Sequence, residues 1–283
     1  MSETIRTEDD AGVRHLVLCR GGASNTITPR LRDELSAALD DAEADPAVRV
    51  VLLRAEGPTF CAGFGLDWST MEQVKEEVDG ARHWDSVSDL AHIGSYAAAF
   101  SKLHTITKPT IAAVQGYCVA GGTDLAFNCD LIVCARSASF GYPPSRVWGV
   151  PEQPWLWVAR LGLQQARRYL FTGDEITSEA AERLGLVIAR FDDPDLHDGA
   201  KALAERVAML SASQLAMIKL VLNDVAHRTY DPPSSRLLGC LFDGVARHTA
   251  EGKDFVRTAD EKGWREAVRE RDAPFGDYAE RSS

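Results

Sequence analysis

The sequence lacks several features that would place it in a large class of proteins at once. It has no apolar run long enough to cross a bilayer, and its first ten residues are acidic and contain no apolar signal core. It has no GxSxG motif and no GxGxxG motif, so it offers neither the usual nucleophile elbow of a hydrolase nor a dinucleotide fingerprint. We therefore expect a cytoplasmic protein that has no membrane partner.

The sequence also has fewer positively charged residues than negatively charged ones. The 31 Lys and Arg residues face 42 Asp and Glu residues, which gives a net charge of −11 and a pI near 5.1. Such a balance argues against nucleic acid or an anionic membrane as the main partner. The six cysteines form no CxxC pair and have no histidine nearby, so we expect buried thiols in a reducing compartment and no metal site.

The 283 residues, 45% of them hydrophobic, are enough for one large α/β domain with a helical appendage. Residues 13–19 and 48–53 are apolar and have the character of strands. Between them, Thr28 and Pro29 provide the N-cap and first position of a helix that ends at Asp45-Pro46. This order predicts a right-handed crossover between parallel strands. Further strands are expected at 110–114, 130–135 and 186–188, and helices at 90–104, 164–171, 178–184 and from 195 to near the end.

The most informative stretch follows the apolar run 110–114. Glycines at 121 and 122 come next, and the pattern after them is helical. A helix that begins behind glycines presents unpaired N–H groups and the positive end of its dipole to an anion or to a carbonyl oxygen that gains charge. Asp124 lies one turn inside this helix start, where it could either act chemically or simply stabilise the helix dipole.

Four motifs in a fixed order resemble the crotonase, or enoyl-CoA hydratase/isomerase, superfamily. They are Asn25-Thr26 after the first strand, Phe60-Cys61-Ala62-Gly63 followed by Leu66, Lys108-Pro109 leading to Ala113-Val114-Gln115-Gly116-Tyr117 and Gly121-Gly122, and Phe140-Gly141-Tyr142-Pro143. The resemblance runs from about residue 13 to residue 278, and it implies a spiral of ββα units with a C-terminal helical region used for trimerisation. We assign the spiral core to residues 1–200 and the helical region to residues 201–283.

The resemblance also implies a ligand and the residues that bind it. The ligand would be an acyl-CoA thioester, with no separate cofactor, and the assembly a homotrimer or a hexamer built as a dimer of trimers. The backbone N–H groups of Phe64 and Gly121 would form an oxyanion hole around the thioester carbonyl. Phe64 and Gly65 stand where the family usually has Ala and Asp. The CoA arm would be lined by Ala23, Ser24, Asn25, Thr26, Ala62, Gly65, Leu66 and Asp67.

The acid/base groups depart from the hydratase pattern. Hydratases of this superfamily use two glutamates, and Asp124 stands at the position of the first. The second position falls on Pro144, or on Ser145 if the alignment shifts, and neither residue is a general base. Glu152 stands where dienoyl-CoA isomerases and an aryl-CoA dehalogenase of the superfamily carry a catalytic Asp. Glu152 could therefore pair with Asp124, or it could be a solvated loop residue.

These observations predict an enzyme that acts on acyl-CoA thioesters through an enolate held in an oxyanion hole. Hydration and double-bond isomerisation are the leading reactions, with Asp124 and Glu152 as acid/base groups. Two alternatives stay open at this point. The absence of a base at Pro144 would suit an acyl-CoA binder without catalytic activity, and the same residues would also suit hydrolysis or C–C cleavage of a cyclic CoA thioester.

Overall fold

The computed structural model describes residues 3–65 and 84–278 of the chain. Within them, one mixed sheet has the spatial order β1-β2-β3-β4-β6-β9, and a smaller sheet has the order β5-β7-β8. The strands are β1 (Ile5–Asp10), β2 (Val13–Leu18), β3 (Val50–Ala55), β4 (Thr110–Val114), β5 (Tyr117–Val119), β6 (Leu131–Ala135), β7 (Ser139–Gly141), β8 (Ile176–Thr177) and β9 (Ala189–Phe191).

The predicted crossover at the start of the chain is confirmed. β2 and β3 pair in parallel, and α1 (Pro29–Ala44) connects them. The Thr28 side chain accepts a hydrogen bond from the N–H of Leu31, and Asp45 is the C-cap, so the helix begins and ends where its capping residues predict. β4 and β6 continue the parallel part of the sheet, and these strands are apolar because both of their faces are covered.

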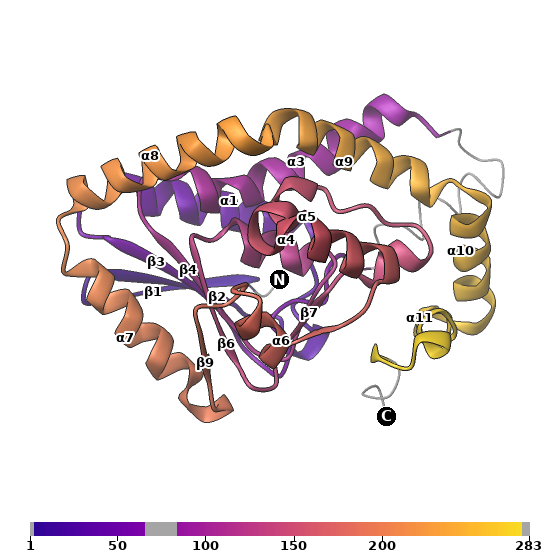
Figure 1. The fold of residues 1–283 in the computed structure, drawn as a ribbon, viewed down its shortest axis with the longest axis horizontal. Helices are drawn as coiled ribbons and strands as arrows, with labels where there is room; N and C mark the ends of the chain where they lie inside the picture. The colour runs from indigo at the N-terminus through magenta and orange to yellow at the C-terminus, as the bar shows by residue number, and fades with distance from the viewer. Residues whose placement is uncertain (1–2, 66–83, 279–283) are drawn as a thin grey trace.

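Helices cover the two faces of the main sheet unequally (Figure 1). α7 (Leu196–Ala208) packs on one face against Val50, Leu52 and Ile111. The other face carries the larger core, which is built with α1, α3 (Ser86–Thr105), α4 (Gly121–Asn128) and α5 (Pro154–Thr172). α4 is buried along its whole length, so the glycine stretch lies at the centre of the molecule.

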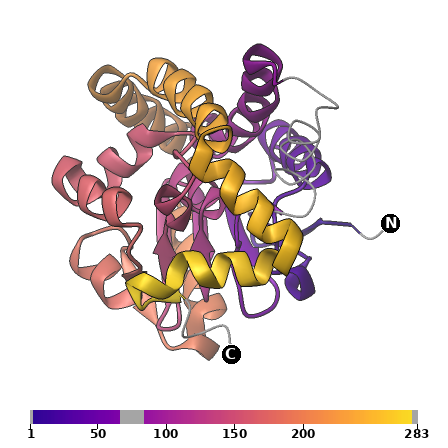
Figure 2. The ribbon, with the colours of Figure 1, turned by 90° about the vertical axis from the view of Figure 1, so that its right-hand side faces the viewer.

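The C-terminal region is helical, as the periodicity predicts. It consists of α8 (Ala212–Tyr230), α9 (Pro232–Arg247), α10 (Ala250–Lys262) and α11 (Trp264–Asp272), and α6 (Ser178–Arg183) precedes it in the core. α9 packs against α3, and α10 and α11 then cross the end of the molecule (Figure 2). The assigned boundary at residue 200 falls inside α7.

Several strand assignments differ from the sequence prediction, which also lacked β7 and β8. β1 was not predicted, because it is an edge strand whose last four side chains are exposed and it therefore carries no apolar periodicity. The strand expected at 186–188 is wrong, since β9 begins at Ala189 and pairs with β6. The segment between β4 and α4 was expected to be a turn, but it contains β5, which pairs with β7.

Candidate active site

The backbone at Gly121 is positioned by β5 and by close packing of a second loop. A Cβ atom at Gly122 would lie 2.4 Å from the carbonyl oxygen of Cys61, and one at Gly63 would lie 2.7 Å from the Cβ of Ala120. Only glycine permits these approaches, because any Cβ would overlap the neighbouring loop. The loop that carries Phe64 is thereby brought against the N-terminus of α4.

The N–H groups of Phe64 and Gly121 are both available to a ligand. Ile27 donates to Gly63 O (2.8 Å), and Gly65 donates to Ile27 O (3.4 Å). In this parallel bridge the N–H of Phe64 points away from Ile27. Gly121 is the first residue of α4, where an N–H has no acceptor within the helix. Across residues 3–65 and 84–278, neither group donates to a protein acceptor. Two such donors in one place can hold a carbonyl oxygen that gains negative charge.

A pair of buried carboxyl groups lies next to this backbone. Asp124 is 1% exposed and Glu152 is 3% exposed, which excludes a solvated loop position for Glu152. The two side chains are hydrogen-bonded to each other. One oxygen of each carboxyl group, Oδ2 of Asp124 and Oε2 of Glu152, has no hydrogen-bond partner among the described residues. These unpaired oxygens can receive or release a proton.

Burial and mutual repulsion place one proton on the pair. Burial raises the pKa of Asp124 to about 6, although its hydrogen bond with Glu152 opposes this shift. Burial, followed by the charge of Asp124, raises the pKa of Glu152 well above its ordinary value. Two buried carboxyl groups in contact resist ionising together, so the pair favours a state that holds one proton. Such a pair can act as a general base and then return the proton as an acid.

The structure adds a third carboxyl group that the sequence analysis did not identify. Asp243 of α9 lines the same cavity as Glu152, and Arg247 one turn later lies beside it, with 3.4 Å between Nε and Oδ2. Arg247 also contacts Asp89 of α3 through its Nη2, at 3.0 Å and 2.9 Å from the two carboxyl oxygens. The i, i+4 spacing of Asp243 and Arg247 in the sequence was the available signal, but exposed helices carry the same spacing.

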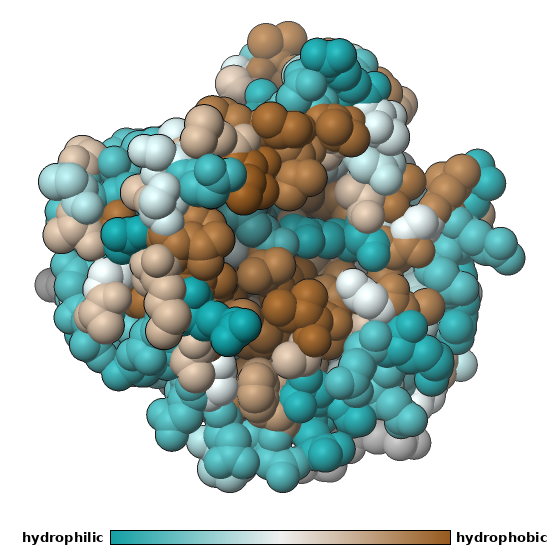
Figure 3. Space-filling view, turned by 60° about the vertical axis from the view of Figure 1, so that its left-hand side comes forward, coloured by the Kyte–Doolittle hydropathy of each residue, from teal (hydrophilic) through white to brown (hydrophobic). Residues whose placement is uncertain are grey.

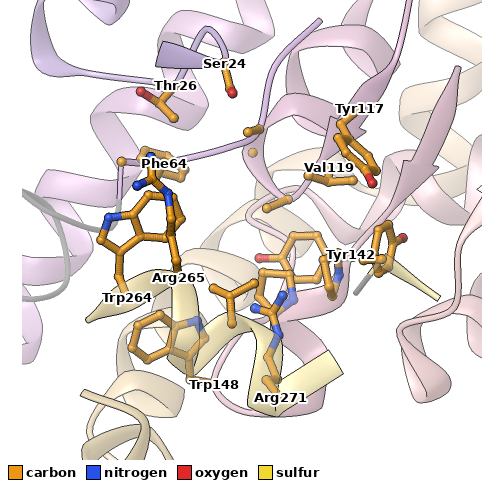
Figure 4. A pocket seen from close by; sticks show the side chains of 18 of the residues that line it. Ser24, Thr26, Phe64, Tyr117, Val119, Tyr142, Trp148, Trp264, Arg265 and Arg271 are labelled. Carbon is orange, nitrogen blue, oxygen red and sulfur yellow. The ribbon is translucent and has the colours of Figure 1, made fainter. Parts of the chain in front are cut away.

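A cavity of about 820 Å³ connects these groups (Figure 4). Of the residues predicted from the sequence, the cavity is lined by Ala23, Ser24, Thr26, Ala62, Phe64, Gly65, Gly121 and Glu152. Asp124, which is buried, does not line the cavity. Leu66 and Asp67, which were expected to contact CoA, lie outside the described residues. The structure therefore brings together groups from both ends of the chain.

Asn25, also expected to contact CoA, has a different position. Its side chain is fully buried, and its amide nitrogen donates to the carbonyl oxygens of Glu56 (2.9 Å) and Thr59 (2.8 Å). Asn25 does not line the cavity. It fastens the loop at 20–26 to the loop after β3, and it thereby holds Ser24 and Thr26 at the cavity wall.

α11 closes the cavity with residues that the sequence analysis did not single out. Trp264, Arg265, Arg269 and Arg271 line it, together with Trp148 and the loop residue Arg20. In Figure 4, the side chains of Trp264, Arg265, Trp148 and Arg271 reach into the pocket that Ser24, Thr26 and Phe64 border. The wall thus combines aromatic surface with arginines, of which Arg269 and Arg271 form ion pairs with the lining residues Glu266 and Asp272.

The described residues offer neither a metal site nor a membrane-spanning helix. Within the described ranges, no group of three or more His, Cys, Asp and Glu side chains is arranged to hold a metal ion. No helix in the same part of the chain has the length and apolar character needed to cross a membrane.

Comparison with known proteins gives a consistent result. Residues 8–234 match the family model of enoyl-CoA hydratase/isomerase. A crystal structure of an enoyl-CoA hydratase from Mycobacterium smegmatis superposes with a TM-score of 0.90 at 40% identity, covering 98% of this chain and 96% of that one. A dienoyl-CoA isomerase from Dictyostelium discoideum is 28% identical over 80% of this chain and 78% of its own length. A 1,2-epoxyphenylacetyl-CoA isomerase from Escherichia coli is 28% identical, with 82% and 86% covered.

Proposed function

Because the chain belongs to the enoyl-CoA hydratase/isomerase family, we propose that it binds an acyl-CoA thioester with the carbonyl oxygen between the N–H groups of Phe64 and Gly121. The carboxyl pair of Asp124 and Glu152 then moves a proton on the acyl chain. The observation that carries this proposal is the combination of two unpaired N–H donors with a buried carboxyl pair that shares one proton.

The cavity wall suits the CoA portion of such a ligand. Ala23, Ser24, Thr26, Ala62 and Gly65 lie along one side and would contact the pantetheine arm. The guanidinium groups of Arg20 and Arg265 supply positive charge for phosphate groups, which arginine binds in a fork geometry, whereas those of Arg269 and Arg271 are paired with Glu266 and Asp272. Leu66 and Asp67 remain predicted CoA contacts.

Among the family's reactions, we favour double-bond isomerisation. The pair takes a proton from the carbon next to the thioester, the electrons move onto the carbonyl oxygen, and a proton returns to a more distant carbon. The bond changes need no redox partner and no cofactor. Pro144 supports this choice, because it cannot supply the second carboxylate with which hydratases of the superfamily hold their water.

Hydration is the second candidate, since the solved relative at 40% identity is described as an enoyl-CoA hydratase. Binding without catalysis, and hydrolysis or C–C cleavage of a cyclic thioester, have no specific observation in their favour. The buried and unpaired oxygens of Asp124 and Glu152 argue against a pure binder, because desolvating them costs free energy that a binding role does not require.

The test is an assay of the purified protein against 2-enoyl-, 3-enoyl- and 3,5-dienoyl-CoA thioesters, read by absorbance and by NMR in D₂O. We expect 3-enoyl or dienoyl thioesters to be isomerised, with deuterium entering the product at the more distant carbon that receives a proton. Hydration alone would replace isomerisation as the assigned reaction. Calorimetric binding of these thioesters without any chemical change would refute catalysis altogether.

The oligomeric state proposed for the chain is a homotrimer, either alone or as half of a hexamer. α8 exposes a run of large apolar side chains, of which Val221 is 65% and Leu222 is 63% exposed, and α9 adds Leu237, Leu238 and Phe242. Figure 3 shows how hydrophobic residues gather around a hollow on one face of the molecule. A surface of this kind commonly binds another chain. Light scattering should give three or six times the chain mass of 30.9 kDa, and a monomer would contradict the proposal.

A further inference from the structure

We propose that Asp243 is a third acid/base residue of this site, which exchanges a proton with the acyl chain at a second carbon, away from the thioester. The proposal rests on the isomerisation proposed above and assigns its second proton-transfer position. Asp243 belongs to the C-terminal helices, whereas Asp124 belongs to the helix behind the glycines.

Two glycines let α9 approach the site closely enough to deliver this side chain. A Cβ atom at Gly239 would lie 2.5 Å from the carbonyl oxygen of Pro151 and 2.6 Å from that of Glu152. One at Gly244 would lie 2.3 Å from Oδ2 of Asp89. α9 is therefore wedged between the Glu152 segment and α3, with Asp243 at the cavity wall between these two close contacts.

The contacts of Asp243 fix its carboxyl group relative to Glu152. The backbone N–H of Val150 lies near the Asp243 carboxyl group and favours its ionised form. The carbonyl oxygen of Val150 accepts a hydrogen bond of 2.9 Å from the hydroxyl of Tyr142. The segment that carries Glu152 is thus held between Tyr142 on one side and α9 on the other, so the two carboxyl groups face the same cavity from adjoining elements.

The surroundings of Asp243 bring the pKa of its carboxyl group close to neutral pH. Burial raises the pKa of Asp243 to about 7, while Arg247 opposes the shift. Asp89 on α3 faces the same guanidinium group, and His92 on α3 lies near both Asp89 and Arg247. Asp124 and the Tyr142 hydroxyl are the other titratable groups in this field. Because Arg247 is shared with Asp89, it does not hold Asp243 permanently ionised.

Isomerisation requires proton transfer at two different carbons, and Asp243 would serve the second one. The hydrogen bond between Asp124 and Glu152 makes that pair one proton-transfer unit in one place. Isomerisation breaks a C–H bond at one carbon and forms a C–H bond at another, two bonds further along the chain. The pair would take the first proton, and protonated Asp243 would give its own proton to the distant carbon. The Glu152 oxygen without a partner would then pass the captured proton back to Asp243 before the next turnover.

The test compares Asp243→Asn with Asp224→Asn. Asp224 forms the same i, i+4 pair with an arginine, Arg228, but its side chain is 57% exposed on α8. In D₂O, deuterium exchange next to the thioester needs the oxyanion hole and the carboxyl pair, whereas isomerisation also needs Asp243. We expect Asp243→Asn to lower isomerisation of a 3-enoyl-CoA about 100-fold and to leave exchange within threefold of wild type. Asp224→Asn should change neither rate.

The pH profile gives an independent readout. Isomerisation by wild type should fall as pH rises through about 7, because Asp243 then loses the proton that it must donate. The residual activity of Asp243→Asn should lack this decline, and Asp243→Glu should restore part of both the rate and the decline. Melting temperatures of the variants show whether each one is folded.

The outcomes separate this assignment from the function on which it rests. Equal losses of exchange and isomerisation in folded Asp243→Asn, or no loss of either, would overturn the role of Asp243 while the proposed function stands. A wild type that hydrates without isomerising would also overturn it. A wild type that neither exchanges nor converts any of the thioesters would refute the proposed function and this assignment together.

Discussion

Replacing Glu152 with glutamine lowers the turnover of an isomerised thioester by about 1000-fold, a typical value for the loss of a positioned acid/base group. Glutamine has nearly the same shape and can still donate a hydrogen bond to Asp124. It cannot accept and release a proton. The Asp124–Glu152 pair would therefore lose proton transfer to a ligand in the cavity that Glu152 lines. Steady-state kinetics measure the loss of turnover, and calorimetry measures the affinity for acyl-CoA.

Acyl-CoA affinity should stay within threefold of wild type in this variant, because the N–H donors at Phe64 and Gly121 are unchanged. Glu205→Gln is the matched control, since Glu205 is exposed on α7 and makes a 3.7 Å ion pair with Lys201. The control should keep full activity. Turnover of Glu152→Gln within threefold of wild type would remove Glu152 from the mechanism, and it would leave the family assignment intact.

Replacing Arg247 with methionine lowers the free energy of unfolding by about 3–5 kcal/mol, the usual cost of leaving a buried charge without its partner. The side chains of Arg247 and Asp89 are 7% and 6% exposed, so water cannot replace the lost contact. Asp243 loses the same cation. Methionine keeps much of the volume, and the loss therefore reports the charge contacts more than packing. Urea denaturation at pH 7 gives the value directly.

The control for this variant is Arg228→Met. Arg228 pairs with Asp224 at the same spacing, but its side chain is 79% exposed, so the change should cost no more than about 0.5 kcal/mol. Adding Asp89→Asn to Arg247→Met should recover part of the stability, because it removes the uncompensated charge. A loss below about 1 kcal/mol in Arg247→Met would contradict a buried ionic cluster.

The buried cluster of Asp89, Asp243 and Arg247 should also make the stability of the protein depend on pH. The pKa of Asp243 is raised to about 7 in the fold from an ordinary value of 3.8. A raised pKa means that the folded state binds the proton more tightly than the unfolded state. The contribution of Asp243 to stability is therefore fully present below about pH 4 and is lost as pH rises towards 7. Arg247→Met should extend this loss to higher pH and increase its total, because it removes the cation that favours the ionised form.

Features that depend on neighbouring residues were predicted correctly, whereas features that depend on contacts between distant segments were not. The crossover from β2 to β3, the caps of α1 and the strand–glycine–helix order at Gly121 depend on neighbouring residues, and the sequence alone predicts them. β1 depends on a partner, since its exposed polar residues are held by pairing with β2. Asn25 was recognised within a motif, but its role as a buried brace depends on two carbonyl groups in another loop.

By itself, the sequence predicted the family, the backbone donors at Phe64 and Gly121, and the two carboxyl residues Asp124 and Glu152. These follow from local order, because glycines and helix starts are properties of short segments. Only the tertiary structure brought Asp124 and Glu152 together in a buried position and placed Asp243 at the cavity that Glu152 lines. The physical reason is that burial and proximity set the protonation of a carboxyl group, and both arise only when segments distant in the chain pack together.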